Sequence, residues 1–508
     1  MTTEPQPLHT FEFFSDSWVN PDSWGEDPQS QSTPIRPENL TIPAPQARRF
    51  RSHRSFETKP ADIDEDWDQS DLDWGLIKTL RVAATSQISE ERAEHPNWTE
   101  TEEHALGRRV IAELVDRWIS EEMRQGHKVD PSLEPRLRKA VFDALFGLGR
   151  LQPLIDSQHI ENIEIHGCDT VHIELKDGTL VDGPPIADSD EELIQDLQFW
   201  ASRSKANPRP FSPSTPRMNL PLGETARLAA MAWVTLRPMV TIRLHGMVEV
   251  TFNDLVERDT LSPLMANFLT AVVRSGASIV VSGAQGAGKT TLCRALCAAL
   301  PPSERIITFE TDRELHLEKM PDKHPRVFGV EARQGSGEFR PDGREAGVFE
   351  IIEALREALR HNADRLLVGE VRGGEIIAMI QAMQSGTGSI STTHARSARD
   401  TYNKLVTCCL EVEGISEAYA NRAIASAINF VAFIKKVNVA APGQPPRRVR
   451  RVTEVVAIEL TADGVAFTDI FTTRNGITRP YTLPPSSFLD DLMEADFDYD
   501  AFVQESQR

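Results

Sequence analysis

The stretch "GAQGAGKT", residues 283–290, constrains the fold of this chain more than any other. It matches the phosphate-loop pattern GxxxxGK[ST] at every fixed position. Such a loop lies between a buried strand and the first turn of a helix, where backbone N–H groups and the helix N-terminus bind phosphate together. The flanks agree, because "SIVVSG" is typical of a buried strand and "KTTLCRALCAAL" of a helix. The stretch therefore predicts nucleotide binding in an α/β domain.

Each residue type in the loop has a separate predicted task. Glycines let the backbone turn so that N–H groups face the phosphates without obstruction by a Cβ atom. The lysine brings a positive charge to the β- and γ-phosphates, and the hydroxyl of Thr290 is suited to ligate Mg²⁺. The residues predicted to bind the nucleotide here are Gly283, Gly286, Gly288, Lys289, Thr290 and Thr291.

Short apolar runs alternate with helical patterns beyond residue 255. "SIVVSG", "RIITFE", "RLLVGE" and "GSISTTH" each resemble a buried strand, and amphipathic helices lie between them. This alternation is typical of βαβ units, which form a parallel sheet covered by helices on both faces. We therefore expect the phosphate loop to belong to a parallel sheet.

Acidic and polar residues follow these runs, at the strand ends where ligands bind in parallel sheets. Glu370 follows "RLLVG" and is interpreted as a metal-binding or water-positioning residue, with a surface turn as the alternative. Glu310, Asp312 and Glu314 follow "RIITF", and one of them is a candidate to accept a proton from attacking water. His394 ends a further strand and is interpreted as a γ-phosphate sensor, against a purely structural histidine.

Length and charge narrow the class of protein. A chain of 508 residues exceeds the size of a single core. The net charge of −21 weighs against a surface that binds nucleic acid directly. Five irregularly spaced cysteines indicate a reducing cytoplasm rather than a disulfide framework. Because no apolar run is long enough to span a bilayer, we expect any membrane association to be peripheral and to depend on a partner protein.

Shifts in pattern predict five segments. Residues 1–73 are polar and acidic with scattered aromatics, which predicts a disordered tail, either merely solvated or docking on a partner through Trp67 and Trp74. Helical spacing, then period-two hairpin patterns around 162–181, then alternating runs follow it. The predicted segments are the tail (1–73), a helical lead-in (74–145), a smaller α+β domain (146–250), the phosphate-loop domain (251–460) and a partly disordered C-terminal extension (461–508).

Over residues 75–460 the chain resembles the type II and type IV secretion and type IV pilus ATPase superfamily. The likeness is strongest to its tight-adherence (Flp) pilus branch, the CpaF/TadA-type ATPases. It rests on "GLGRLQPLIDSQHIENIEIHG", "RPMVTIRLH" and "ALRHNADRLLVGEVRGGE", together with the phosphate loop, in this order. The resemblance implies a RecA-like P-loop NTPase core, ATP and Mg²⁺ as ligands, and a hexameric ring attached to an inner-membrane platform protein.

The resemblance also implies roles for single residues. It makes Glu314 the catalytic glutamate, Glu370 the Walker B acid and metal ligand beside Thr290, and His394 the His-box residue. Arg372 matches the arginine after the Walker B glutamate. The remaining two matches, Arg227 and Arg243, are arginines through which the N-terminal domain closes over the nucleotide.

Three departures from the family pattern bear on activity. Thr311 stands where the Asp box usually has an aspartate, and the His box is shortened around Thr387 and Gly388. Asn362 and Ala363 stand before the Walker B strand where many relatives have an arginine and a proline. The leading expectation is a cytoplasmic ATPase that drives pilus assembly or protein secretion. The alternatives are an ATPase for conjugative DNA transfer and a nucleotide-gated scaffold with weak hydrolysis.

Overall fold

The computed structural model describes residues 67, 69, 71–95, 97–203, 211–223, 226–244, 249–333, 340–341, 343, 346–385, 388–439, 447–462 and 464–507. Almost all of the predicted disordered tail lies outside these residues. The chain divides into two compact units, one containing Asp73–Glu134 and the other containing Pro135–Arg508 together with Arg49–Leu72. Within the described residues, no helix has both the length and the apolar character needed to cross a membrane.

The first unit consists of two long helices, α1 (Trp74–Glu94) and α2 (Glu100–Arg124), which pack against each other. Asp73 caps α1 through its side chain, and Thr99 and Glu102 form a reciprocal capping box at the start of α2. The apolar residues of α2 recur every three or four positions, and these residues are buried. The predicted helical lead-in is therefore present.

The second unit begins with α3 (Leu133–Phe146), the short helices η3 (Gly149–Leu151) and α4 (Gln152–Asp156), and a six-stranded sheet with the order β3-β2-β1-β6-β5-β4. All neighbouring strands in this sheet are antiparallel, and α5 (Asp190–Arg203) packs its apolar residues into the same core. The strands are β1 (Ile160–His166), β2 (Thr170–Leu175), β3 (Leu180–Asp182), β4 (Arg217–Leu222), β5 (Ala226–Met231) and β6 (Met239–Leu244). The predicted hairpin corresponds to β1 and β2.

Trp67 belongs to the core of this antiparallel sheet domain. Its side chain is only 3% exposed and lies in the same apolar cluster as Leu151, Ile163 and Leu197. The nearby Asp71 carboxylate pairs with the Arg136 guanidinium on α3. The interpretation of Trp67 as a free anchor for a partner is therefore wrong, because its ring is already buried by its own chain.

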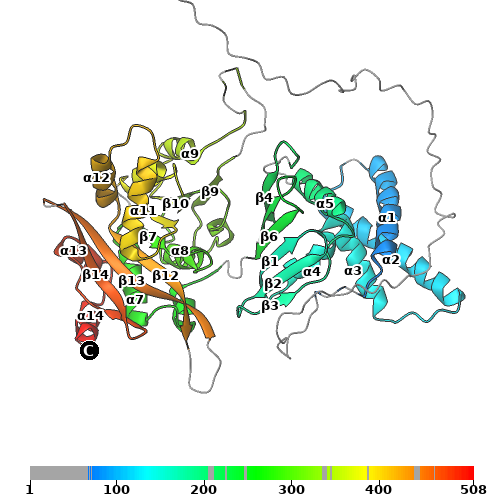
Figure 1. Ribbon diagram of the computed structural model, residues 1–508, viewed down its shortest axis with the longest axis horizontal. Helices are drawn as coiled ribbons and strands as arrows, with labels where there is room; N and C mark the ends of the chain where they lie inside the picture. The colour runs from blue at the N-terminus through cyan, green and yellow to red at the C-terminus, as the bar shows by residue number, and fades with distance from the viewer. Residues whose placement is uncertain are drawn as a thin grey trace, which may run out of the picture. The chain divides into compact units, whose positions relative to one another are not determined.

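A nine-stranded sheet with the order β15-β14-β13-β12-β7-β11-β10-β8-β9 follows (Figure 1). The strands from β12 to β9 are parallel, while β13, β14 and β15 extend the sheet in antiparallel fashion. The strands are β7 (Ile279–Ser282), β8 (Ile306–Glu310), β9 (Val327–Glu331), β10 (Arg365–Val371), β11 (Ile390–Thr393), β12 (Phe430–Val439), β13 (Arg447–Thr461), β14 (Gly464–Arg474) and β15 (Ile477–Pro480). The predicted parallel sheet is confirmed.

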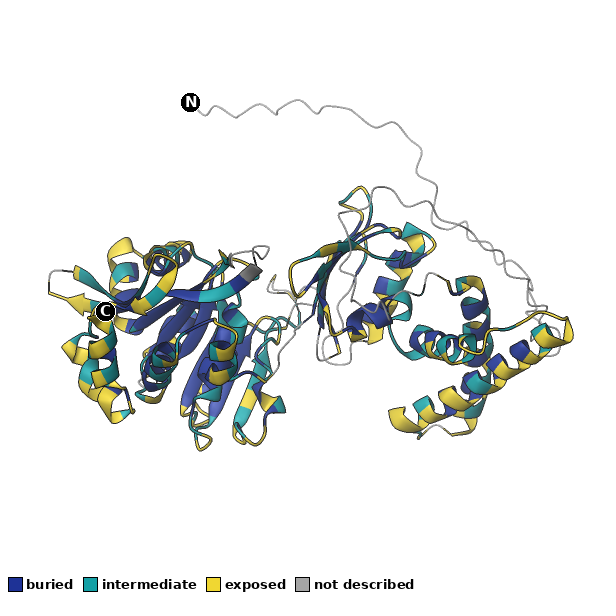
Figure 2. Ribbon diagram, turned by 90° about the horizontal axis from the view of Figure 1, so that it is seen from below, coloured by how far each residue is buried: buried dark blue, intermediate teal, exposed yellow. Residues whose placement is uncertain are grey.

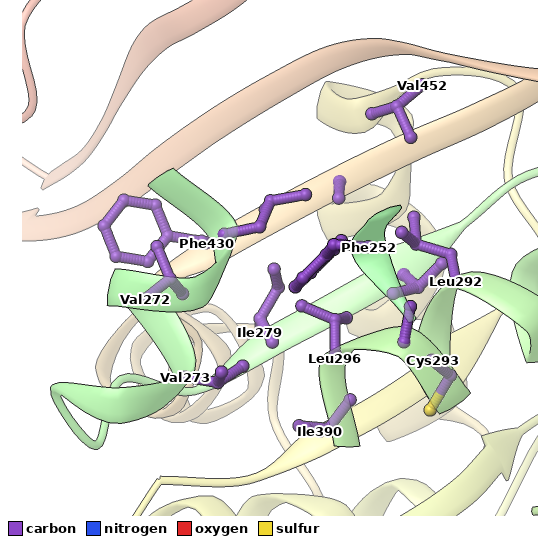
Figure 3. Packing of buried hydrophobic residues seen from close by; sticks show 14 of the residues in the cluster. Phe252, Val272, Val273, Ile279, Leu292, Cys293, Leu296, Ile390, Phe430 and Val452 are labelled. Carbon is purple, nitrogen blue, oxygen red and sulfur yellow. The ribbon is translucent and has the colours of Figure 1, made fainter. Parts of the chain in front are cut away.

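Helices cover both faces of the nine-stranded sheet, whose central strands β7 and β11 are buried (Figure 2). Alternate residues of β7 point to opposite faces, so Ile279 and Val281 join one apolar cluster and Val280 joins the other. Figure 3 shows part of the first cluster, which includes Leu292 and Leu296 of α8, Ile279 of β7 and Phe430 of β12. The helices are α6 (Phe252–Glu257), α7 (Pro263–Arg274), α8 (Lys289–Ala298), η4 (Leu317–Lys319), α9 (Ile351–Ala358), α10 (Ile376–Met383), α11 (Ala398–Leu410), α12 (Glu417–Ala427), α13 (Ser486–Glu494) and α14 (Tyr499–Ser506).

The C-terminal segment differs from the expectation of a partly disordered extension. Residues after 460 form β14, β15, α13 and α14, and Phe471, Leu492 and Phe502 are fully buried in the core that also contains Phe268. Acidic residues alternate with these apolar ones and lie on the outer side of the helices. The acidic composition therefore reflects a solvated face of packed helices rather than missing structure.

Candidate functional site

The phosphate loop joins β7 to α8 as the sequence predicts. Gly283, Gly286 and Gly288 have φ values of 158°, 69° and 99°, and Gly288 caps α8 in the left-handed region. A Cβ atom on Gly283 would lie 2.2 Å from the Ile434 carbonyl oxygen, so only glycine fits the close approach of this loop to β12. Thr290 and Thr291 lie half-buried in the first turn of α8.

Lys289 points back into the loop. Its Nζ donates a hydrogen bond to the Ala284 carbonyl oxygen at 3.2 Å and lies 3.2 Å from Nδ1 of His394 at the end of β11. The residue is 8% exposed, and this burial lowers the pKa of the ammonium group to about 8 although Glu370 opposes the change. The ammonium group of Lys289 therefore lies in a buried position between the phosphate loop and the end of β11.

Glu370 lies where β10 runs along β11. Its Oε1 is 3.1 Å from Nε2 of His394, and its Oε2 accepts a hydrogen bond of 2.8 Å from Nε of Arg372. Burial alone would raise the pKa of Glu370, but the bonds from His394 and Arg372 outweigh it and hold the pKa at about 2. The carboxylate is thus ionised and connected through His394 to Lys289.

Glu314 links three parts of the second unit. Its Oε2 accepts the hydroxyl hydrogen of Thr290 at 3.0 Å, and its Oε1 pairs with the guanidinium of Arg227 on β5. Arg227 also lies 3.5 Å from the carboxylate of Asp312. Both oxygens of the predicted catalytic carboxylate therefore have partners, one on the phosphate-loop helix and one on the antiparallel sheet.

Arg227 and Arg243 lie directly opposite each other on β5 and β6. Arg227 reaches the acidic loop after β8, whereas the charge of Arg243 acts on Lys289 and contributes to the lowering of its pKa. The antiparallel register thus brings both predicted arginines toward the phosphate loop and its acidic neighbours.

Glu310, at the end of β8, supports the loop that carries Glu314. One carboxylate oxygen accepts hydrogen bonds of 2.9 Å from the backbone nitrogens of both Glu314 and Leu315. Because the side chain is completely enclosed, burial raises its pKa to about 7 even though these bonds favour the anion. Glu310, the last residue of β8, therefore orients the loop that follows it. Asp312 and Glu314 lie in that loop and face Arg227.

A cleft joins these groups. Its walls include Thr290 from α8, Glu314 and Asp312 from the loop after β8, Glu370 and Arg372 from the end of β10, and Arg227 from β5. It lies at the carboxyl ends of the parallel strands, the edge at which ligands bind in such sheets.

Comparison with known proteins decides the family. The model of the type II/IV secretion system protein family matches residues 153–444, which is more than half of the chain. This chain is a member of the type II/IV secretion system protein family.

Relatives with described roles match this family member over a limited part of their length. It is 40% identical over 146 residues to the type IV secretion system protein PtlH of Bordetella pertussis, covering 28% of this chain and 40% of PtlH. It is 34% identical over 149 residues to VirB11 of Bartonella quintana, covering 29% of this chain and 38% of VirB11. The matches thus span less than half of these relatives.

Solved structures offer a distant likeness. The ATPase DotB of Legionella pneumophila is 18% identical, with coverage of 61% of this chain and 79% of DotB and a TM-score of 0.42. A superposition at this level supports no inference about what this family member does.

Two arginines near the site of this family member were not predicted from the sequence. Arg294, 3% exposed on α8, donates from Nε to the Glu314 carbonyl oxygen at 3.0 Å, and so fixes the same loop as Glu310. Arg450, on β13, donates from Nε to the Gly286 carbonyl oxygen at 3.2 Å. Arg294 lies in the predicted helix, but its spacing of five residues from Lys289 does not place the two on one helix face, and nothing local marks Arg450.

The donors present in this family member fit a nucleotide with Mg²⁺. The hydroxyl of Thr290 and the carboxylates of Glu314 and Glu370 are hard oxygen ligands, which Mg²⁺ prefers. Within the described ranges, no three His, Cys, Asp or Glu side chains are grouped to hold a metal by themselves. Mg²⁺ at phosphate loops takes one or two protein ligands and completes its shell with phosphate oxygens and water, and the Thr290 hydroxyl and the Glu370 carboxylate are oxygen donors of that kind.

Proposed function

We propose that this chain is a Mg²⁺-dependent ATP hydrolase. The observation that carries the proposal is the meeting of Lys289 with the His394–Glu370 pair, beside the Thr290–Glu314 bond, at the carboxyl edge of a parallel sheet. A phosphate loop alone binds nucleotide, but hydrolysis also needs an acid that orients water and polar groups that respond to the γ-phosphate. Glu314, Glu370 and His394 are placed for those tasks.

The proposed roles follow from the contacts. Lys289 binds the β- and γ-phosphates, whose negative charge favours the ionised form of its buried ammonium group. Thr290 and Glu370 would hold Mg²⁺, which would neutralise negative charge on the phosphates. Glu314 accepts a proton from the attacking water once nucleotide binding separates it from Thr290. His394 connects Lys289 to Glu370, so it senses whether the γ-phosphate is present, and Arg372 keeps Glu370 ionised.

In the cell, we propose that hydrolysis drives pilus assembly or protein secretion. The family assignment supports the secretion role, and the names of PtlH and VirB11 refer to type IV secretion. The motif resemblance supports the tight-adherence pilus branch, a hexameric ring, and a cytoplasmic location with attachment to an inner-membrane platform protein. Arg227 and Arg243 provide a route by which turnover moves the antiparallel sheet domain relative to the nucleotide.

A nucleotide-gated scaffold is the second candidate. It is favoured by the state of Glu314, whose two oxygens are bound by Arg227 and Thr290, next to Thr311 in the altered Asp box. If these bonds persist after ATP binds, Glu314 is unable to accept a proton and the protein binds nucleotide without turnover.

Steady-state ATPase measurements distinguish the two candidates. Wild-type protein, Lys289→Ala and Glu314→Gln are assayed with Mg²⁺, and particle size is recorded with and without ATP. Turnover that both substitutions abolish supports the hydrolase. ATP binding and ring formation without turnover above that of the variants supports the scaffold and rejects the hydrolase.

A further inference from the structure

Arg450 connects the phosphate loop to the antiparallel sheet domain. Its Nε donates to the Gly286 carbonyl oxygen at 3.2 Å, and its Nη2 pairs with the carboxylate of Glu161 on β1. Its side chain also packs on the loop, because a Cβ atom on Gly288 would lie 3.1 Å from Cδ of Arg450. The guanidinium of Arg450 therefore bonds to the loop at Gly286 and to a carboxylate of the antiparallel sheet, while its Cδ atom lies beside Gly288.

The strand register places two positively charged side chains next to each other, and this repulsion costs free energy unless nearby carboxylates balance it. Arg450 and Lys436 lie directly opposite each other on β13 and β12, and like charges in that position repel. The antiparallel sheet supplies two carboxylates, since Glu161 pairs with Arg450 and Glu174 lies 3.9 Å from Lys436. The cation pair beside the loop is thus balanced by charges from the other domain.

Glu161 occupies an unusual position in its strand. The register of β1 against β2 shifts between Ile160 and Asn162, which makes Glu161 the extra residue of a bulge. Bulges re-aim side chains that a regular ladder would direct elsewhere. Its side chain is 15% exposed, which is consistent with a role in a fixed contact rather than on a solvated surface.

We propose that Arg450 is a positioning residue for the phosphate loop and that Glu161 holds it in place. The proposal rests on the nucleotide binding proposed above. A carbonyl oxygen of a phosphate loop points away from the phosphates while the N–H groups point toward them. By fixing the Gly286 carbonyl, Arg450 orients the adjoining N–H groups for phosphate. The antiparallel sheet then contacts the loop at Gly286 through Glu161 and Arg450. A second chain of contacts leads from Arg227 through Glu314 to Thr290.

Calorimetric titration with MgADP tests the proposal. Arg450→Ala is expected to weaken ADP binding about fivefold, as for loss of one net hydrogen bond. Glu161→Gln is expected to weaken it about twofold to threefold, because a neutral amide holds the guanidinium less firmly. Arg450→Lys is expected not to restore affinity, since an ammonium group lacks the fork that reaches both partners. The double variant, with Arg450→Ala and Glu161→Gln together, should bind ADP no more weakly than Arg450→Ala alone, because both changes break the same chain of contacts.

Arg451→Ala is the matched control. Arg451 is the next residue of β13 and is also held by an ion pair, with Asp259, and by the Gly476 carbonyl oxygen. Melting temperatures show whether both alanine variants lose similar stability. Equal loss of ADP affinity in the two variants would show a nonspecific effect and overturn the proposal. Unchanged affinity in Arg450→Ala, or tighter binding in Glu161→Gln, would also overturn it, the latter because Glu161 would then compete with phosphate.

Failure of the proposed function has a different signature. Wild-type protein would then bind no MgADP, or Lys289→Ala would bind it as tightly as wild type does. If MgADP binding depends on Lys289 but not on Arg450, the proposed nucleotide binding stands and the positioning role of Arg450 is rejected.

Discussion

Arg227 and Glu314 form an ion pair although 87 positions separate them in the chain. Arg227 extends from β5 of the antiparallel sheet, and Glu314 follows the parallel strand β8. The second carboxylate oxygen of Glu314 accepts the Thr290 hydroxyl, so the pair ends on the phosphate-loop helix. Glu314, the acid proposed to activate water, thereby also connects the antiparallel sheet to the nine-stranded sheet.

Glu314→Gln is expected to reduce ATP turnover about 10²-fold to 10⁴-fold, because an amide accepts no proton from water. ADP affinity should change little, since Glu314 is proposed to act on the attacking water rather than to bind the phosphates. Steady-state kcat and a binding titration measure the two effects. Glu318→Gln, in the short helix η4 that follows this loop and paired with Arg313 at 3.4 Å, serves as the control. Equal losses in both variants would contradict the assignment.

ADP affinity is expected to fall as pH rises past about 8, the pKa to which burial lowers Lys289. The neutral amine that predominates above this pH offers no positive charge to the phosphates, so binding must take up a proton. The loss should be about tenfold between pH 7 and pH 9. Lys289→Arg keeps its charge over this range and should bind ADP with a flat profile. A sloping profile in that variant would assign the titration to another group.

Glu310→Gln is expected to raise the melting temperature relative to wild type at pH 8 but not at pH 4.5. Burial raises the folded-state pKa of Glu310 from 4.5 to about 7. Its contribution to stability is therefore fully present below pH 4.5 and is lost as pH rises through about 7, by up to about 1.4 kcal/mol per pH unit. Glutamine retains the oxygen that accepts both backbone N–H groups and never ionises. The same difference in melting temperature between Glu310→Gln and wild type at both pH values would refute this account.

Gly288→Ala is expected to impair nucleotide binding strongly. The residue has a φ of 99°, which an alanine rarely adopts, and its new Cβ would lie 3.1 Å from Arg450. Such backbone strain costs about 1–3 kcal/mol, which the loop relieves by moving its N–H groups. Gly374→Ala is the control, because a Cβ there meets no heavy atom within 4 Å. ADP titrations that give equal affinities for the two variants would argue against a strained loop.

Trp67→Ala is expected to destabilise the antiparallel sheet domain by about 3–5 kcal/mol, the usual cost of removing a large buried aromatic side chain. Chemical denaturation followed by fluorescence measures the change. Trp98→Ala removes a half-buried ring that stacks on His95 in the helical unit, and should cost less. A negligible effect at Trp67 would mean that its contact with Leu151 and Ile163 does not contribute to stability.

Much of the fold was predictable because it depends on local patterns. The alternating apolar runs predicted β7, β8, β10 and β11, and period-two spacing predicted β1 and β2. The C-terminal segment was not predictable in this way, since its acidic residues hide buried positions such as Phe471 and Phe502. Composition averages over both faces of a helix, whereas packing uses one face only.

The sequence by itself determined the phosphate loop, because glycines at fixed positions before a lysine and a threonine impose one backbone path. It also indicated the acids at the ends of neighbouring strands, since parallel strands bring their carboxyl ends to one edge. Only the tertiary structure decided which partners these groups have. The bonds of Glu314 to Arg227 and of Arg450 to Glu161 join residues far apart in the chain. Such pairs depend on strand register and on a bulge, which no local pattern encodes.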